Sequence, residues 1–133
     1  MEDCIFCKIV KGEIPCYKIY ENKKAIAFLD INPIAKGHIL VLPKNHYENI
    51  FEIDEESIKE VALAIKNVAI LQREKLGLQG MNIFQANNAI AGQTIFHIHF
   101  HLVPRYAGDN INAWPKSNYF EKDIKGLHKL LTK

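Results

Sequence analysis

The sequence has little of what marks several large classes of protein. Its three cysteines are few and odd in number, which argues against a framework of disulfide bonds. Its 17 lysine and arginine residues nearly balance its 15 aspartate and glutamate residues, and a net charge of +2 argues against a dedicated nucleic-acid binder. No stretch approaches the roughly 20 apolar residues of a membrane span, and no apolar signal segment opens the chain. We therefore expect a cytoplasmic protein that binds neither nucleic acid nor membrane.

The hydrophobic pattern predicts one domain that mixes helices and strands. A length of 133 residues with 48% hydrophobic side chains suits a single domain with its own core. Apolar spacing predicts a short helix over residues 4–11 and a long one that starts after Asp54 and ends at Gly77. Strands are predicted over residues 18–21, 25–29, 38–42, 81–86 and 96–103. Short turns join most of them, so the expected fold class is α+β with a mostly antiparallel sheet.

The most informative feature is a run in which His97, His99 and His101 alternate with apolar residues. Because side chains alternate between the faces of a strand, the three imidazoles are predicted to form one row, while Ile98 and Phe100 point into the core. The row has three interpretations: incidental histidines on a half-buried strand, a three-histidine zinc site, or a nucleophile that attacks phosphorus with help from its neighbours.

The loop before the histidines favours phosphorus chemistry. Residues 87–94 combine small residues with the amide of Gln93 and the hydroxyl of Thr94, which donate hydrogen bonds to anionic oxygens. Gly92 lets the backbone approach a ligand closely. These features fit a phosphate-containing substrate better than a bare metal hydrolase.

Cys4 and Cys7 form a C-x-x-C pair, for which zinc binding, redox chemistry and chance are all open. A thioredoxin-type redox motif is expected near a βαβ unit, which the pattern does not predict. A structural zinc site needs about four nitrogen or sulfur ligands, of which the pair supplies two. Cys16 is left over and is expected to be an ordinary thiol.

The histidine run from His97 to Val103 resembles the signature of the histidine triad (HIT) family. The similarity continues upstream in residues 91–94, 36–46, 28–31 and 4–9. The C-x-x-C pair resembles the bacterial-type form of the Hint-like branch. The resemblance implies a HIT domain over residues 4–106, with about five antiparallel strands, one long helix and one short one. Residues 107–133 would form a C-terminal tail that packs on the domain or on a partner subunit, with a short helix near residues 123–131.

The resemblance also implies a nucleotide hydrolase or transferase that acts at the α-phosphate of a purine nucleotide. The nearest activity is that of a purine nucleoside phosphoramidase acting on an AMP conjugate. His99 would be the nucleophile that forms a nucleotidyl-histidine intermediate, His101 would assist proton transfer, and His38 would lie behind them. The alternatives are a dinucleoside polyphosphate hydrolase and a nucleotide-binding regulatory protein with vestigial catalysis.

Substrate contacts and a metal site follow from the same resemblance. Gln93 and Thr94, with Asn87 nearby, would hold phosphate oxygens, and Asp30 would accept hydrogen bonds from the ribose. The base would lie among the apolar side chains of Ile5, Phe6, Ile9, Phe28 and Ile31. One structural zinc per chain would be held by Cys4, Cys7, His46 and His97, and no organic cofactor is expected.

The long helix carries more apolar surface than one buried face needs. Leu63, Ile70 and Leu71 widen its stripe, which indicates packing against a partner subunit. With the resemblance, this predicts a homodimer.

Overall fold

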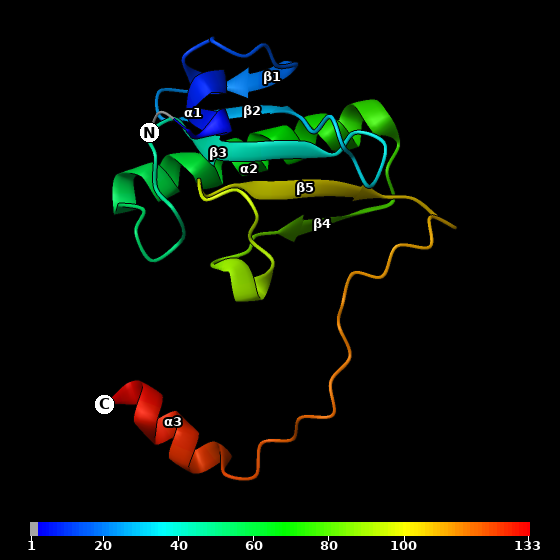
Figure 1. Ribbon diagram of the computed structural model, residues 1–133. Helices are drawn as coiled ribbons and strands as arrows, with labels where there is room; N and C mark the ends of the chain where they lie inside the picture. The colour runs from blue at the N-terminus through cyan, green and yellow to red at the C-terminus, as the bar shows by residue number, and fades with distance from the viewer. Residues whose placement is uncertain (1–2) are drawn as a thin grey trace.

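The computed structural model describes residues 3–133, and its centre is one five-stranded sheet (Figure 1). All neighbouring strands are antiparallel, in the order β1-β2-β3-β5-β4. The strands are β1 Lys18–Glu21, β2 Ala25–Leu29, β3 Ile39–Pro43, β4 Gly80–Phe84 and β5 Phe100–Arg105. The helices are α1 Ile5–Val10, α2 Glu55–Leu76 and α3 Ile124–Thr132, with a 3-10 turn, η1, at Ala89–Ala91. The predicted α+β class with an antiparallel sheet is confirmed.

The long helix α2 covers one face of the sheet (Figure 1). The Asp54 carboxylate caps its first turn by accepting a hydrogen bond from Ser57 N at 2.8 Å. Gly77 ends the helix in a left-handed conformation with φ of 64°. The predicted start and end of this helix are therefore confirmed. Its buried side packs on alternate residues of the central strands, in a core of Val61, Ala64, Val68, Ala25, Ala27, Ile39, Val41 and Leu102.

The short helix α1 packs on the opposite face of the sheet. There Phe6 contacts the other set of alternating side chains, which are Ile26, Phe28, Leu40 and Leu42. Because β2 and β3 are covered on both faces, their sequences are almost continuous apolar runs. The sheet thus separates a face covered by α2 from a face that carries α1.

The strand that carries the histidines is not where the period-two pattern predicts. The prediction of residues 96–103 is wrong at both ends, because β5 begins at Phe100 and continues through Pro104 to Arg105. Before Phe100 the backbone bends, and Ile98 N donates to Tyr47 O at 2.8 Å instead of joining the ladder. Pro104 has no N–H to donate, but it lies beyond the residues that pair with β3 and is paired with β4 alone.

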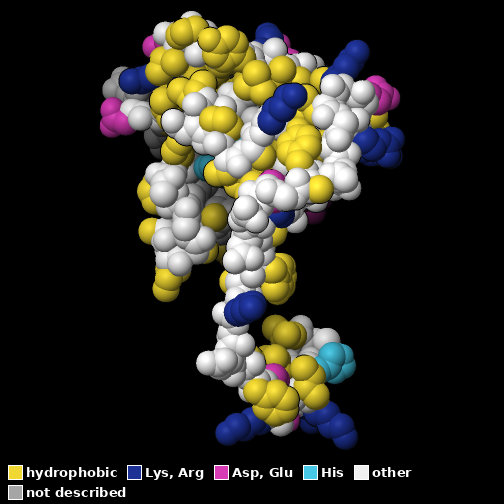
Figure 2. Space-filling view, turned by 90° about the vertical axis from the view of Figure 1, so that its right-hand side faces the viewer, with side chains coloured by type: hydrophobic (Ala, Val, Ile, Leu, Met, Phe, Trp, Pro, Cys, Tyr) yellow, Lys and Arg dark blue, Asp and Glu magenta, His cyan; other side chains and the backbone are white. Residues whose placement is uncertain are grey.

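The residues after β5 leave the sheet as an extended tail that ends in α3 (Figure 1). The Arg105 guanidinium fixes the point of departure, since it pairs with both carboxylate oxygens of Asp109 at 2.8 Å and donates to Ile111 O at 2.6 Å. The predicted terminal helix is present. Figure 2 shows it set apart from the main body, and its exposed apolar side chains are Ile124, Leu127, Leu130 and Leu131. Within residues 3–133 no helix is long and apolar enough to cross a bilayer.

Candidate active site and metal centre

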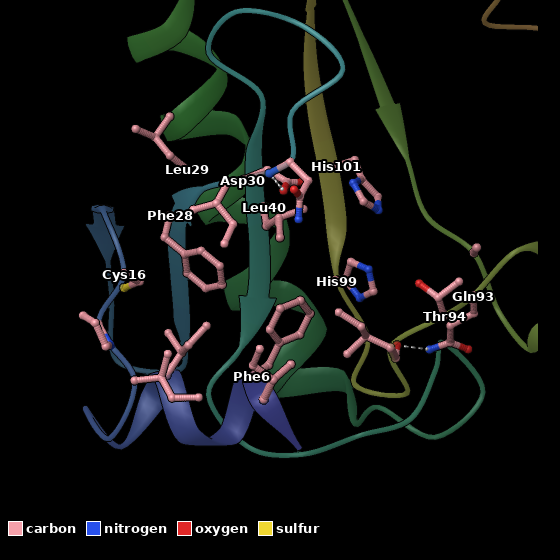
Figure 3. A pocket seen from close by; sticks show the side chains of 18 of the residues that line it. Phe6, Cys16, Phe28, Leu29, Asp30, Leu40, Gln93, Thr94, His99 and His101 are labelled. Carbon is pink, nitrogen blue, oxygen red and sulfur yellow. Dashed lines mark hydrogen bonds between the residues drawn. The ribbon is translucent and has the colours of Figure 1, made fainter. Parts of the chain in front are cut away.

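A cavity of about 340 Å³ opens on the face of the sheet that carries α1 (Figure 3). One part of its wall is apolar and includes Ile5, Phe6, Ile9 and Phe28, and the remainder brings together Asp30, Thr94, His99 and His101. Residues from α1, β2 and β5 and from the loops 30–32 and 92–95 therefore meet around one space. Every residue predicted to contact substrate lines this cavity except Asn87.

The ring of His99 is held in a single orientation at the cavity wall. Its Nδ1–H donates to His97 O at 2.8 Å, and the ring of Phe6 packs edge to face against it at 5.0 Å between centroids. Burial lowers the pKa of His99, and the hydrogen bond to His97 O opposes this only in part. The imidazole is therefore neutral near pH 7, and Nε2 keeps its lone pair. This is the form in which an imidazole acts as a nucleophile.

The tautomer of His101 follows from a chain of hydrogen bonds that begins at a backbone amide. Ile34 N–H can only donate, so His38 Nδ1 accepts it, at 3.2 Å, and the proton of that ring is on Nε2. His38 Nε2–H then donates to His101 Nδ1 at 3.0 Å. The proton of neutral His101 is consequently on Nε2. Burial, together with the neighbouring His99 and His38, lowers the pKa of His101 to about 4, so this ring is neutral near pH 7.

Asp30, His38 and His101 also lie close enough together to suggest a second metal site, but the hydrogen bonds favour a different interpretation. A metal on His38 Nε2 would require the proton of this ring on Nδ1, where it would face the N–H of Ile34. The Asp30 carboxylate lies 3.5 Å from His38 Nε2, and its other oxygen accepts from Asn32 N at 2.8 Å. The hydrogen bonds therefore account for the His38–His101 pair without a metal, with the Asp30 carboxylate beside it.

The polar residues of the loop before the histidine run, residues 87–94, differ in their availability to a ligand. Gln93, which is labelled in Figure 3, is buried. Its amide is already bonded to three backbone groups: Glu48 O at 2.6 Å, Ile95 O at 3.1 Å and Asn88 N at 2.8 Å. Its side chain therefore shapes the loop.

Asn87 lies away from the cavity wall, because its side chain bonds to Gln85 and to Ile50 N. Thr94 is exposed and lines the cavity, so of these three residues its side chain is the most available to a phosphate oxygen.

A second cluster lies beside the cavity and contains the four predicted metal ligands, Cys4, Cys7, His46 and His97, whose ligand atoms are all within 4.8 Å of one another. The Sγ–Nδ1 distances are 3.4 Å for Cys4–His97, 3.4 Å for Cys7–His46 and 3.6 Å for Cys7–His97. A tetrahedral zinc with Zn–S of about 2.3 Å and Zn–N of about 2.0 Å would place sulfur and nitrogen about 3.5 Å apart. The donor set and its spacing therefore fit a metal of this kind.

The surroundings of the cluster also fit a metal site. His97 is fully buried and its Nε2–H donates to Pro43 O at 2.8 Å, which leaves Nδ1 facing the thiols. Burial lowers the pKa of His97 to about 4, so its imidazole is neutral, as a ligand must be. Cys7 N donates to Cys4 Sγ at 3.4 Å, so α1 holds the first sulfur in place at its own N-terminus.

The sequence reasoning missed several residues of the cavity wall. Ile14, Pro15 and Cys16 lie in the segment between α1 and β1, and Cys16 was expected to be an ordinary thiol. The remaining additions are Leu29, Asn32, Leu40, Ala86 and Ile95. Leu40 could have been identified from strand alternation, since it shares a face of β3 with Leu42. No local pattern identifies the loop residues, because the packing of distant segments brings them together.

Comparison with known proteins places the chain in a family. A family model described as "HIT domain" matches residues 11–108. "Protein hit" of Bacillus subtilis is 40% identical over 136 residues, which cover 99% of this chain and 94% of that protein. The adenosine 5'-monophosphoramidase hnt1 of Schizosaccharomyces pombe is 40% identical over 127 residues, which cover 93% and 92%.

Solved structures agree with the sequence relatives. A HIT family protein from Bacillus anthracis superposes with a TM-score of 0.90 at 36% identity, covering 98% of this chain and 95% of that one. A Zn-bound histidine triad family protein from Mycobacterium smegmatis gives a TM-score of 0.78 at 36% identity, covering 98% and 91%. With matches of this extent in sequence and in fold, the chain belongs to the HIT family and is Hint-like.

Proposed function

We propose that this protein is a purine nucleoside phosphoramidase that acts through a nucleotidyl intermediate on His99. The observation that carries the proposal is the fixed, neutral His99 at the cavity wall, whose Nδ1 proton is held by His97 O and whose Nε2 is left as a nucleophile. The proposal is further supported by two relatives of about 40% identity, from Schizosaccharomyces pombe and Candida albicans, that are adenosine 5'-monophosphoramidases.

In the first step His99 Nε2 attacks the α-phosphorus, and the P–N bond breaks with its electron pair on the leaving nitrogen. That nitrogen takes up a proton from solvent while it accepts a hydrogen bond from Nε2–H of His101, whose neutral ring keeps its own proton. Water then attacks phosphorus and gives up a proton to solvent, the bond to His99 Nε2 breaks, and AMP leaves with the oxygen of that water. Two displacements at a positioned imidazole replace one difficult attack by water.

The other cavity residues are assigned to binding. The purine would lie against Ile5, Phe6, Ile9, Phe28 and Ile31, and the Asp30 carboxylate would accept hydrogen bonds from the ribose hydroxyls. Thr94 would donate its hydroxyl to a phosphate oxygen. Gln93, whose amide is bonded to the backbone, would shape the loop that carries Thr94, and Asn87 would join this loop to residue 50.

We assign a zinc ion to Cys4, Cys7, His46 and His97. With four protein ligands such an ion has no open position, so it would supply structural bracing. Cys4 and Cys7 connect it to α1, which carries Phe6, and His97 connects it to the carbonyl that holds the His99 proton. The chemistry at phosphorus is carried out by His99 and His101.

The choice of phosphoramidate over dinucleoside polyphosphate rests on charge. A polyphosphate leaving group carries several negative charges, yet no lysine or arginine of the described chain lines the cavity. An amine needs one proton to leave, and His101 presents an N–H. The test is kcat/KM for adenosine 5'-phosphoramidate against diadenosine tetraphosphate. A higher value for the polyphosphate would reassign the substrate, and no turnover of either would favour a regulatory nucleotide-binding protein.

We also propose that the protein is a homodimer. The sheet ends at β4, whose Ile83 is 51% exposed, and α2 leaves Leu63 49% exposed. The apolar side chains of α3 also lie on the surface at the end of the tail (Figure 2). A second copy would cover these surfaces. Light scattering should give the mass of a dimer at micromolar concentration, and the mass of a monomer would refute this assignment.

A further inference from the structure

Gln72 is a buried polar residue on the face of the sheet opposite the cavity. It lies on α2 and is 2% exposed. Its Nε2 donates to two backbone carbonyls, Gly37 O at 2.8 Å and Leu102 O at 3.3 Å. Its Oε1 is buried without a hydrogen-bond partner in the described part of the chain. The reverse orientation of the amide would place this oxygen against two carbonyl oxygens, so the hydrogen bonds fix the orientation.

An unpaired buried carbonyl costs free energy, so an apolar side chain would suit this place in the core better than an amide if packing were its only task. A buried polar group with an unpaired oxygen is expected where the group serves function at the expense of stability. The position of the two acceptors indicates which function.

The two carbonyls belong to the immediate neighbours of the paired histidines. Gly37 precedes His38, and Leu102 follows His101. The ladder between β3 and β5 begins with the pair Ile39–Leu102, so no strand pairing connects the backbone before Ile39 to β5. The amide of Gln72 makes this connection from the other side of the sheet.

The turn before β3 is held closely against α2. Gly37 has φ of 84°, and a Cβ at this position would overlap Leu76 Cδ1, one turn after Gln72 on the same helix. Tyr106 Oη donates to Lys36 O at 2.8 Å, so the start of the tail also restrains this turn. The backbone that carries His38 is therefore restrained by groups on α2 and after β5 that do not touch the cavity.

We propose that Gln72 is a positioning residue that holds His38 against His101, so that His101 keeps its proton on Nε2. The inference rests on the proposed function for its effect on turnover, and on geometry alone for its effect on the histidine pair. The His38 Nε2–His101 Nδ1 distance is 3.0 Å, and a hydrogen bond weakens steeply as its angle departs from linear. Fastening Gly37 and Leu102 to the same nitrogen fixes the spacing of the two backbones from which these rings project.

The test compares Gln72→Met with Val68→Ala. Methionine keeps the length of the side chain and removes the donor. Val68 lies one turn earlier on the same buried side of α2, and its apolar side chain has no donor to offer to either carbonyl. Nitrogen-15 NMR of the histidine rings reports which nitrogen of His101 carries the proton and whether a coupling crosses the bond from His38. Gln72→Met should lose that coupling and lower kcat for adenosine 5'-phosphoramidate about tenfold, with KM within twofold of wild type. Val68→Ala should lower the melting temperature and leave the coupling and kcat in place.

Gln72→Glu is the conservative variant. A carboxyl buried against two carbonyls donates only when protonated, so its coupling and kcat should recover as the pH is lowered, unlike those of Gln72→Met. Retention of the coupling in Gln72→Met, or loss of the coupling without loss of kcat, would overturn the inference. If the wild-type protein turns over no phosphoramidate, the proposed function fails, and the NMR comparison alone decides whether Gln72 holds the histidine pair.

Discussion

Replacing His38 by leucine should remove the hydrogen bond that fixes the tautomer of His101 and leave His99, the proposed nucleophile, unchanged. His38 is 3% exposed, and its Nε2–H is the donor to His101 Nδ1, while Ile34 N–H occupies its other nitrogen. In His38→Leu the Nδ1 atom of His101 loses its donor. The ring is then free to carry its proton on Nδ1 and to present a bare nitrogen to the leaving group, while His99 stays bonded to His97 O.

The size of the effect follows from the hydrogen bond that is lost. A hydrogen bond between neutral groups contributes about 0.5–1.5 kcal/mol net. At about 1.4 kcal/mol for each factor of ten, this changes the tautomer ratio by roughly 2- to 12-fold. Removing a preorganised hydrogen-bond donor from a group that develops charge in the transition state costs about 10²–10³-fold in rate. The fraction of rings with the proton on Nε2 falls by at most the factor by which the ratio falls. We therefore expect His38→Leu to lower kcat measurably but by no more than about 12-fold, and His101→Ala to lower it by about 100-fold or more.

The assay is steady-state turnover of adenosine 5'-phosphoramidate at pH 7, with His38→Gln as the matched control. The glutamine amide can place an N–H near the position of Nε2, so this variant should retain more activity than His38→Leu. KM should change little in either, because the base and ribose contacts lie elsewhere in the cavity. A loss in His38→Leu as large as that in His101→Ala would show that His38 acts on substrate directly. Unchanged kcat would refute control of the tautomer by this hydrogen bond.

Three further predictions concern the nucleophile, the metal and pH. His99→Ala should lose several orders of magnitude in kcat yet bind AMP with near wild-type affinity by calorimetry, and substantial turnover would exclude the covalent route. Elemental analysis should find about one zinc per chain, and the double variant Cys4→Ser, Cys7→Ser should lose it and melt at lower temperature; a metal-free wild type that melts like the variant would exclude the site. Stability should fall as the pH is lowered from about 6.5 to 4, because His97 and His101 have a pKa of about 4 when folded, so the unfolded chain binds more protons in this window. Melting temperatures that are flat across this window would contradict the burial of neutral imidazoles.

The parts of the fold that sequence predicts well are those with a local physical cause. Asp54 and Gly77 mark the ends of α2 because an N-cap carboxylate and a left-handed glycine act within one turn. The buried runs of β2 and β3 are equally clear. The position of β5 was not predictable in this way, because the period of two continues through a bend that depends on the partner of Ile98 N, far away at Tyr47 O.

The candidate site shows the same difference between features with a local cause and features that depend on distant residues. The residue types at the site were identified from their motifs, and the structure brings nearly all of them to one cavity or to the adjoining cluster. Their individual tasks depend on hydrogen bonds over long sequence separations. Gln93 was expected at phosphate, but Glu48 O lies 2.6 Å from its amide and engages it. Gln72 gave no signal, because one glutamine on the buried side of a helix resembles an ordinary interruption of the apolar stripe.

The bend before β5 explains how one histidine run serves two sites. If the strand extended to residue 96, alternation would place His97 in the same row as His99 and His101, beside the substrate. The bend instead turns His97 toward Cys4 and Cys7, while its carbonyl remains directed at His99 Nδ1. Under the proposed function, the side chain of His97 would therefore hold the metal, and its backbone carbonyl would hold the nucleophile, His99. A metal that fixes the side chain of His97 would also fix its backbone carbonyl. Occupancy of the cluster and the orientation of His99 are therefore expected to change together.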